Sequence, residues 1–208
     1  MNEDYMNIPD IVIGRLPLYL RALQYMLLEN HFVTSSKELS ERLGISAAQI
    51  RKDLSQFGEF GKQGTGYQVE FLITKLKQIM HIDTTWDVII VGAGDIGHGI
   101  ARYPGFKNQG FRVTKVFDNN PEKIGQKIGD FIVEDSAKMA NAIREANIKI
   151  AMIAVPASQA QQVADILVNA GIKAILNYAP ITLNLPVGIK IQYIDPVVHL
   201  QRMTFYLE

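Results

Sequence analysis

The stretch Val88-Ile89-Ile90-Val91-Gly92-Ala93-Gly94-Asp95-Ile96-Gly97 decides the fold of this 208-residue chain. Its apolar start is typical of a buried strand, and a G-x-G-x-x-G pattern follows directly and leads into a helical stretch. In this pattern the first glycine permits a tight turn, the second lets the backbone approach a pyrophosphate, and the third lets helix and strand pack closely. The helix N-terminus then presents unpaired N–H groups to the phosphates. The pattern predicts a dinucleotide site formed by Gly92, Ala93, Gly94, Asp95, Ile96 and Gly97.

Further residues of this site are expected at the ends of the neighbouring strands. Asp118 ends the next apolar run, where a carboxylate can accept hydrogen bonds from the adenosine ribose and would repel a 2′-phosphate. This position favours NAD and NADH over the phosphorylated cofactors. Val155-Pro156 and Asn177-Tyr178 also follow strands and complete the expected pocket. The competing interpretations are a glycine-rich turn that binds nothing and ordinary loop turns at the two later positions.

The second half of the chain alternates buried strands with helices. The apolar runs 88–91, 113–117, 148–155 and 172–176 read as strands, and the stretch 158–170 reads as a helix between two of them. Strands that alternate with helices indicate a parallel sheet covered on both faces. We therefore expect an α/β, Rossmann-like domain, followed by an apolar-rich helix over 197–207.

The first half has helical spacing instead. Leu16, Tyr19, Leu20, Leu23, Met26 and Leu27 fall on one face of a first helix. Ser35 with Glu38 and Ser46 with Gln49 carry capping-box patterns that open a second and a third helix. These two helices, separated by Gly44-Ile45, form a helix-turn-helix candidate, and the glycine-rich stretch 58–66 suggests the wing of a winged helix. A last amphipathic helix is expected to use Phe71, Leu72, Leu76 and Ile79.

The third helix has one polar face that suits DNA. Ile50, Leu54 and Phe57 should pack inward, and Asp53 lies near the core edge, where we expect a structural role. The outward arc and the wing tip suit phosphates and base edges. The expected DNA-binding residues are Ser46, Ala48, Arg51, Lys52, Ser55, Gln56, Lys62 and Gln63. The alternative is an ordinary solvated face, since residues 1–80 carry nine basic and nine acidic side chains.

Composition excludes several classes of protein. The chain has no cysteine, so it has neither disulfides nor thiol-based redox chemistry. No stretch approaches the ~18 consecutive apolar residues of a membrane span, and the acidic start does not resemble a secretory signal. We expect a cytoplasmic protein without a membrane or metal partner.

Several longer stretches resemble the redox-sensing transcriptional repressors called Rex. The similarity lies in 15–21 (RLPLYLR), 50–58 (IRKDLSQFG), 61–67 (GKQGTGY), the dinucleotide loop, 103–106 (YPGF) and 170–177 (AGIKAILN), and it extends to Asp195. It covers nearly the whole chain, and the run from the third helix into the wing is the most specific part.

This resemblance implies a winged-helix domain (1–83), a Rossmann-like NAD(H)-binding domain (84–194) and a C-terminal helix (195–208) exchanged between the chains of a homodimer. It implies binding to an A/T-rich inverted repeat of double-stranded DNA, with release when NADH replaces NAD. It also implies a polar switch that joins Arg21, Tyr103 and Asp195 of the partner chain.

A small NAD-dependent oxidoreductase with an N-terminal helical extension is the alternative function, and an interaction module with a vestigial nucleotide fold is a third. An oxidoreductase needs an acid or base beside the nicotinamide. None of the four histidines is placed for that role; they are His31, His81, His98 and His199. We therefore expect a regulator and not an enzyme.

Overall fold

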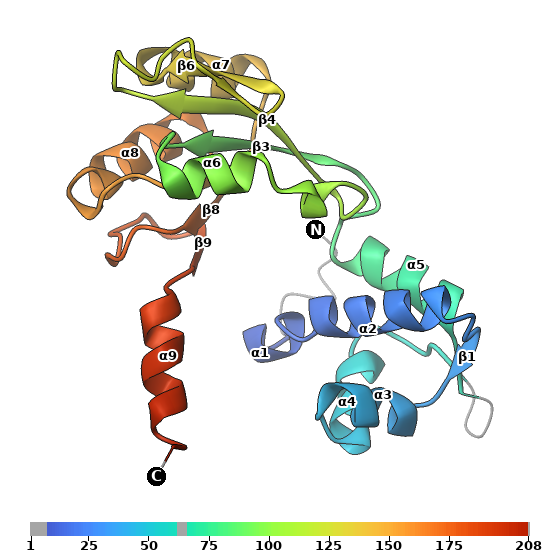
Figure 1. The fold of residues 1–208 in the computed structure, drawn as a ribbon. Coiled ribbons are helices and arrows are strands. Elements are labelled where there is room, and N and C mark those ends of the chain that lie inside the picture. The colour runs from blue at the N-terminus through green and yellow to red at the C-terminus, as the bar shows by residue number, and fades with distance from the viewer. Residues whose placement is uncertain (1–7, 62–65, 208) are drawn as a thin grey trace. The chain divides into compact units, whose positions relative to one another are not determined.

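The computed structural model describes residues 8–61 and 66–207. The chain divides into two compact units, Met1–Thr84 and Thr85–Glu208, whose elements are labelled in Figure 1. The first unit is helical with a short two-stranded ribbon. It contains α1 (Asp10–Ile13), α2 (Leu16–Leu28), β1 (Val33–Thr34), α3 (Ser36–Leu43), α4 (Ala47–Ser55), β2 (Tyr67–Gln68) and α5 (Val69–Ile79).

The core of the first unit forms around α2. The predicted apolar face of this helix is confirmed, with Leu16, Tyr19, Leu23 and Met26 almost completely buried. The prediction for α5 is wrong at Phe71, which is 46% exposed. Because the helix begins at Val69, its inward residues follow the i, i+3, i+4, i+7 spacing from there and place Phe71 on another face. The buried residues of α5 are Val69, Leu72, Ile73 and Leu76.

By length and composition alone, the helical segment Asp10–Leu28 would pass for a membrane span. The charged residues Arg15 and Arg21 interrupt it. Its buried side chains form the core of the first unit together with those of α3, α4 and α5. The apolar character of this segment is accounted for by that core.

Both predicted N-caps are present, but the capping boxes are only half formed. The Ser35 hydroxyl accepts a hydrogen bond from the Glu38 N–H, and Ser46 does the same for Gln49, each at 3.2 Å. The Glu38 carboxylate bonds to Thr34, and the Gln49 side chain bonds to Asp53, so neither reaches back to its cap residue. Tertiary partners have replaced the local reciprocal bond in both helices.

β1 and β2 form a two-residue antiparallel ribbon, and β2 directly follows the glycine-rich stretch 58–66. Val33 pairs with Gln68 and Thr34 with Tyr67. Gly66, just before β2, has φ +75°, and a Cβ there would lie 2.4 Å from the Thr34 carbonyl oxygen. This close approach of the two strands therefore requires glycine at position 66.

The second unit is a seven-stranded sheet in the order β5-β6-β4-β3-β7-β8-β9. Its strands are parallel except β5, which pairs antiparallel with β6. The strands are β3 (Trp86–Val91), β4 (Phe111–Asp118), β5 (Lys127–Ile128), β6 (Phe131–Asp135), β7 (Ile150–Ile153), β8 (Ala174–Asn177) and β9 (Lys190–Tyr193). The helices are α6 (Asp95–Ala101), α7 (Met139–Glu145), α8 (Ala157–Ala170) and α9 (Pro196–Thr204), with short 3₁₀ turns at Pro104–Phe106 and Ser136–Lys138.

Helices cover both faces of this sheet, as predicted. Successive residues of β3 point to opposite faces: Ile89 packs in the cluster that includes α7 and α8, and Ile90 packs in the one that includes α6. The four predicted strands are present, whereas β5, β6 and β9 were not expected. β5 and β9 are the edge strands and β6 lies next to β5. Their shorter and more polar runs give no continuous apolar signal.

Candidate cofactor and DNA sites

A cavity of about 550 Å³ opens at the carboxyl ends of β3, β4 and β7. This is the edge at which open α/β sheets bind ligands, and α6 begins here with its N–H groups. Predicted residues that line the cavity are Gly92, Gly94, Asp95, Ile96, Asp118, Val155, Pro156 and Tyr178. The fold therefore brings most of the predicted cofactor residues together around one cavity.

The glycine loop adopts the geometry that its pattern predicts. Gly92 has φ +105°, and a Cβ on it would lie 2.4 Å from the Ala154 carbonyl oxygen. A Cβ on Gly97 would lie 1.8 Å from the Gly92 carbonyl oxygen. The first glycine thus permits the turn beside β7, and the third lets α6 pack against the end of β3.

Asp118 is almost completely buried at the end of β4. Its carboxylate accepts hydrogen bonds from the N–H groups of Ala93 (2.7 Å) and Asn120 (2.8 Å) and lies 3.4 Å from the Lys123 ammonium. Burial alone would raise the pKa of Asp118, but the two backbone bonds and Lys123 together lower it below its ordinary value. The group is therefore ionised at neutral pH and faces the cavity as an anion.

Two predicted cofactor residues have structural roles in the chain itself. Ala93 is buried and uses its N–H on Asp118. The Asn177 side chain is 1% exposed, donates to the carbonyls of Ala179 and Ile181 and accepts from the Ala179 N–H. Asn177 does not line the cavity but shapes the turn that carries Tyr178.

Part of the cavity lining was not predicted from the sequence. The turn after Asp118 adds Asn119, Asn120 and Lys123 to the cavity wall, and Ser136 and Gln159 add further polar groups. The Asp-Asn-Asn-Pro sequence at 118–121 is typical of a turn. This turn signature, directly after Asp118, could have predicted that the turn contributes to the cavity wall.

In the first unit, α4 presents the predicted polar arc. The exposed residues of the arc are Ser46 at the helix start, Ala48, Arg51, Lys52 and Ser55, and Gln56 is half-buried. The Arg51 guanidinium donates to the Ser36 hydroxyl at 2.9 Å, which ties this arc to the start of α3. Lys62 and Gln63 lie outside the described residues. The arc and the nearby hollow lined by Arg51, Ser55 and Gly61 form the candidate DNA surface.

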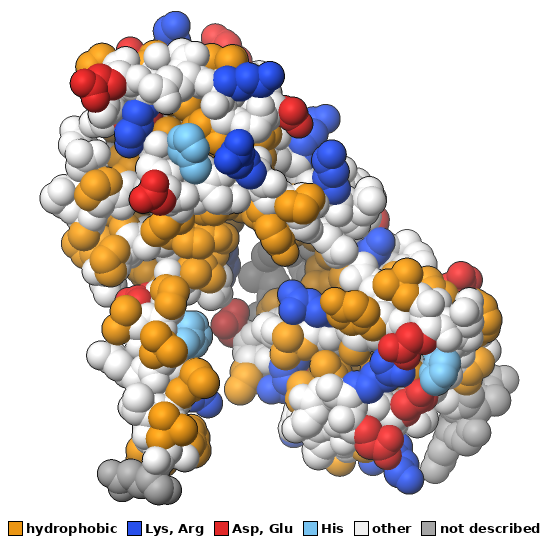
Figure 2. Space-filling model, viewed as in Figure 1, with side chains coloured by type: hydrophobic (Ala, Val, Ile, Leu, Met, Phe, Trp, Pro, Cys, Tyr) orange, Lys and Arg blue, Asp and Glu red, His pale blue; other side chains and the backbone are white. Residues whose placement is uncertain are grey.

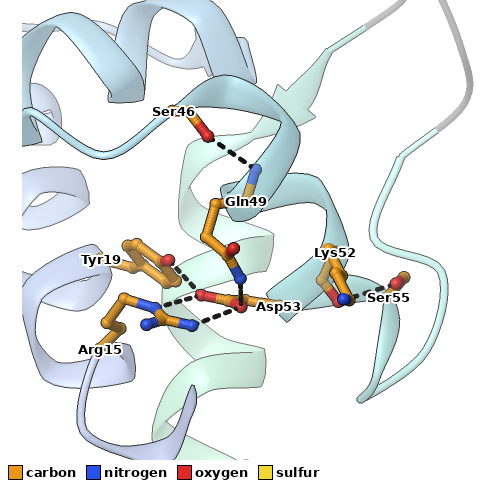
Figure 3. A network of polar contacts seen from close by, with 7 residues as sticks. All are labelled: Arg15, Tyr19, Ser46, Gln49, Lys52, Asp53 and Ser55. Carbon is orange, nitrogen blue, oxygen red and sulfur yellow. Dashed lines mark hydrogen bonds and ion pairs between the residues drawn. The ribbon is translucent and has the colours of Figure 1, made fainter. Parts of the chain in front are cut away.

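The opposite side of α4 is held by Asp53, whose structural position is confirmed. Asp53 accepts hydrogen bonds from Arg15 and Tyr19 of the α2 region and from Gln49 (Figure 3). Burial would raise the pKa of Asp53, but these three donors and the Arg15 charge lower it overall. The carboxylate is thus a buried, fully partnered anion.

The proposed switch residues lie on different elements. Arg21 is exposed on α2, and Tyr103 is exposed and packs edge-on against Phe106 with 5.3 Å between ring centroids. Asp195 accepts a hydrogen bond from the Val197 N–H at 2.9 Å and so caps α9.

No described residue of α9 is buried. Figure 2 shows hydrophobic side chains gathered along this helix. Its exposed apolar residues continue past the helix end and are Val197, Val198, Leu200, Met203, Phe205, Tyr206 and Leu207. An exposed apolar strip of this size is typical of an interaction surface.

Comparison with known proteins gives the same division of the chain. Residues 7–55 match the family described as putative DNA-binding protein N-terminus, and residues 83–181 match the CoA binding domain family. The chain is 52% identical over 199 residues to the redox-sensing transcriptional repressor Rex of Chloroflexus aggregans, covering 96% of this chain and 94% of that one. It is 41% identical over 199 residues to the Rex of Carboxydothermus hydrogenoformans, covering 96% of each.

Solved structures agree over both units. The crystal structure of RSP in complex with β-NAD⁺ and operator DNA matches with a TM-score of 0.91 and 41% identity, over 96% of this chain and 92% of that one. The complex of RSP with β-NADH matches with a TM-score of 0.88 and 39% identity, over 97% and 95%. RSP is a Rex-family repressor. The expected winged-helix and Rossmann-like fold is confirmed, and this chain belongs to the Rex family of redox-sensing transcriptional repressors.

Proposed function

We propose that this protein represses transcription by binding operator DNA as a homodimer and that it leaves the DNA when NADH replaces NAD. One observation carries the proposal: a single chain joins an exposed basic arc on α4 to a glycine-loop cavity faced by the Asp118 anion. RSP, which is similar over both units, was crystallised with NAD⁺ and operator DNA and, separately, with NADH.

In this proposal the cavity holds the adenosine and diphosphate of NAD or NADH. The N–H groups at the start of α6 would bind the diphosphate, and Asp118 would accept a hydrogen bond from the adenosine ribose. The walls of the cavity would be formed by Gly92, Gly94, Val155, Pro156 and Tyr178. The nicotinamide ring is cationic when oxidised and neutral when reduced, and this difference is what the protein must read.

The DNA contacts would come from α4 and the wing, with an A/T-rich inverted repeat as operator. Arg51 and Lys52 are assigned to phosphates, and Ala48, Ser55 and Gln56 to base edges in the major groove. Two such surfaces, related by the two-fold axis of a dimer, would match an inverted repeat. We assign α9 to the dimer contact because its apolar strip is uncovered.

An oxidoreductase function is disfavoured. The close relatives carry the name of transcriptional repressors. Among the described cavity residues the ionisable groups are Asp95, Asp118, Lys123 and Tyr178, and burial raises the pKa of Tyr178. We assign the protein to the cytoplasm, where DNA and the NAD(H) pool meet.

The test is a binding titration on DNA that the protein itself selects from a random-sequence pool. We expect a selected inverted repeat, and NADH added at constant NAD⁺ should weaken binding about 5- to 150-fold, a usual range for allosteric coupling. NADPH is the matched control and should change little. A protein that selects no sequence, or whose DNA affinity ignores NADH, would contradict the proposal.

A further inference from the structure

The Asp53 carboxylate joins α4, which carries the proposed DNA surface, to the start of α2. Arg15 Nε and Nη2 donate to its two oxygens at 2.5 and 2.8 Å, and the Tyr19 hydroxyl donates to one of them at 2.5 Å. Arg15 is the N-cap of α2 and Tyr19 lies in its first turns, whereas Asp53 belongs to α4. Figure 3 shows the three side chains converging between the helices.

Asp53 lies across α4 from the exposed arc. At ~100° of rotation per residue, Arg51 and Ser55 fall nearly opposite Asp53, and Ala48 falls close to them. Rolling α4 about its axis would therefore swing these three positions away from the direction they now face. The contacts that resist such rolling determine what the arc can read.

Apolar packing specifies the rotation of α4 less directionally than hydrogen bonds do. Ile50 and Leu54 bury α4 in the core, but hydrophobic contact is non-directional. The Arg15 fork grips both oxygens of one carboxylate, and a bidentate pair of this kind has a specific geometry. Replacing a buried ion pair by apolar residues of similar volume is often neutral or stabilising. Stability alone therefore does not account for a completely buried carboxylate here.

We propose that Arg15 and Tyr19 are positioning residues for DNA reading, which fix the rotation of α4 by holding Asp53. The inference rests on the proposed DNA-binding function. Base-edge hydrogen bonds require good geometry, whereas phosphate contacts carry no sequence information. A loosened clamp should therefore reduce sequence discrimination more than it reduces affinity for DNA in general.

The experiment compares Tyr19→Phe and Arg15→Lys with wild type. Tyr19→Phe keeps the packed ring and removes one donor, and Arg15→Lys keeps the charge and loses the fork. Ile73→Val is the matched control, because it trims the same core from α5 without touching Asp53. Each protein is titrated at one salt concentration with the duplex that wild type selects from random DNA and with the same duplex after its half-sites are scrambled. Thermal melting checks folding.

We expect both variants to melt cooperatively. The ratio of their affinity for the selected duplex to that for the scrambled duplex should fall about fivefold or more, which is comparable with the loss of one base contact. Affinity for the scrambled duplex should stay within about twofold of wild type, and Ile73→Val should keep the full ratio. An unchanged ratio in both folded variants overturns the inference. If both variants unfold while Ile73→Val stays folded, the Arg15, Tyr19 and Asp53 cluster serves stability, and this result also overturns the inference. If wild type itself selects no duplex, the proposed function has failed instead.

Discussion

The backbone N–H of Ala93 donates a 2.7 Å hydrogen bond to Oδ2 of Asp118, which joins the glycine loop to the end of β4. The carboxylate also accepts from the Asn120 N–H and from the Lys123 ammonium. A carboxylate offers about four acceptor positions, so these donors leave room for one more, such as a ribose hydroxyl. Asp118 thus serves the shape of the loop and the proposed cofactor together.

The first prediction follows for Asp118→Asn. We expect NADH affinity to fall about tenfold, as for loss of one hydrogen bond to a charged group, and the preference for NADH over NADPH to shrink. Isothermal titration with both cofactors measures the two effects. Asp130→Asn, the same change at an exposed turn, should alter neither. Wild-type affinities that are equal for the two cofactors would remove Asp118 from ribose recognition.

Asp95 supports the second prediction. Asp95 lines the cavity in the first turn of α6, where its negative charge interacts favourably with the helix dipole but would repel a bound diphosphate. Asp95→Asn should therefore lower the melting temperature of the free protein slightly and raise NADH affinity about threefold at low salt. High salt should abolish the gain in affinity, because salt screens exposed charges. Weaker NADH binding at every salt concentration would show that Asp95 is not an obstacle to the diphosphate.

Two glycines of α6 give the third prediction. A Cβ at Gly97 would lie 1.8 Å from the Gly92 carbonyl oxygen, whereas one at Gly99 would contact nothing within 4 Å. Gly97→Ala should displace the loop and abolish measurable NADH binding. Gly99→Ala should keep it and stabilise the protein by about 0.4–1 kcal/mol, because alanine reduces the freedom of the unfolded chain. Cofactor titration and thermal melting of the pair decide this, and equal behaviour of the two variants would contradict the packing role of Gly97.

The fourth prediction concerns Arg51 and Lys52. If each neutralises one phosphate, replacing either by alanine should reduce the slope of log affinity against log salt by about 1. Lys173→Ala removes an exposed charge from the sheet unit and should leave the slope unchanged. Slopes that match wild type in both α4 variants would mean that this helix does not face DNA.

Asp195 supports the fifth prediction, which concerns the proposed switch. Since its side chain caps α9, Asp195→Asn is a sharper test than alanine: asparagine is an equally good cap but carries no charge. We expect NADH binding to stay within about twofold while operator affinity loses its response to NADH, because a ligand acts only through contacts that differ between states. Equal release of wild type and variant on NADH titration would exclude Asp195 from the mechanism.

Local patterns account for what the sequence could predict. The glycine loop, its strand and its helix follow one another directly between residues 86 and 101, and the caps at Ser35 and Ser46 act over three positions. The partners of Asp53 could not be read in this way, because Arg15 and Tyr19 lie 38 and 34 positions away. The inward turn of Asn177 was missed for a similar reason: a side chain that follows a strand can serve its own turn as readily as a ligand.

The uncovered strip on α9 has a consequence for gene dosage. If two copies bury this strip against each other, the share of paired chains depends on how many copies a cell holds. Only a pair can span both halves of an inverted repeat. At low copy number, operator occupancy would then rise with about the square of the protein concentration, so doubling expression would raise operator occupancy roughly fourfold. The amount of protein would set the threshold of the response, and the cofactor ratio would act around it.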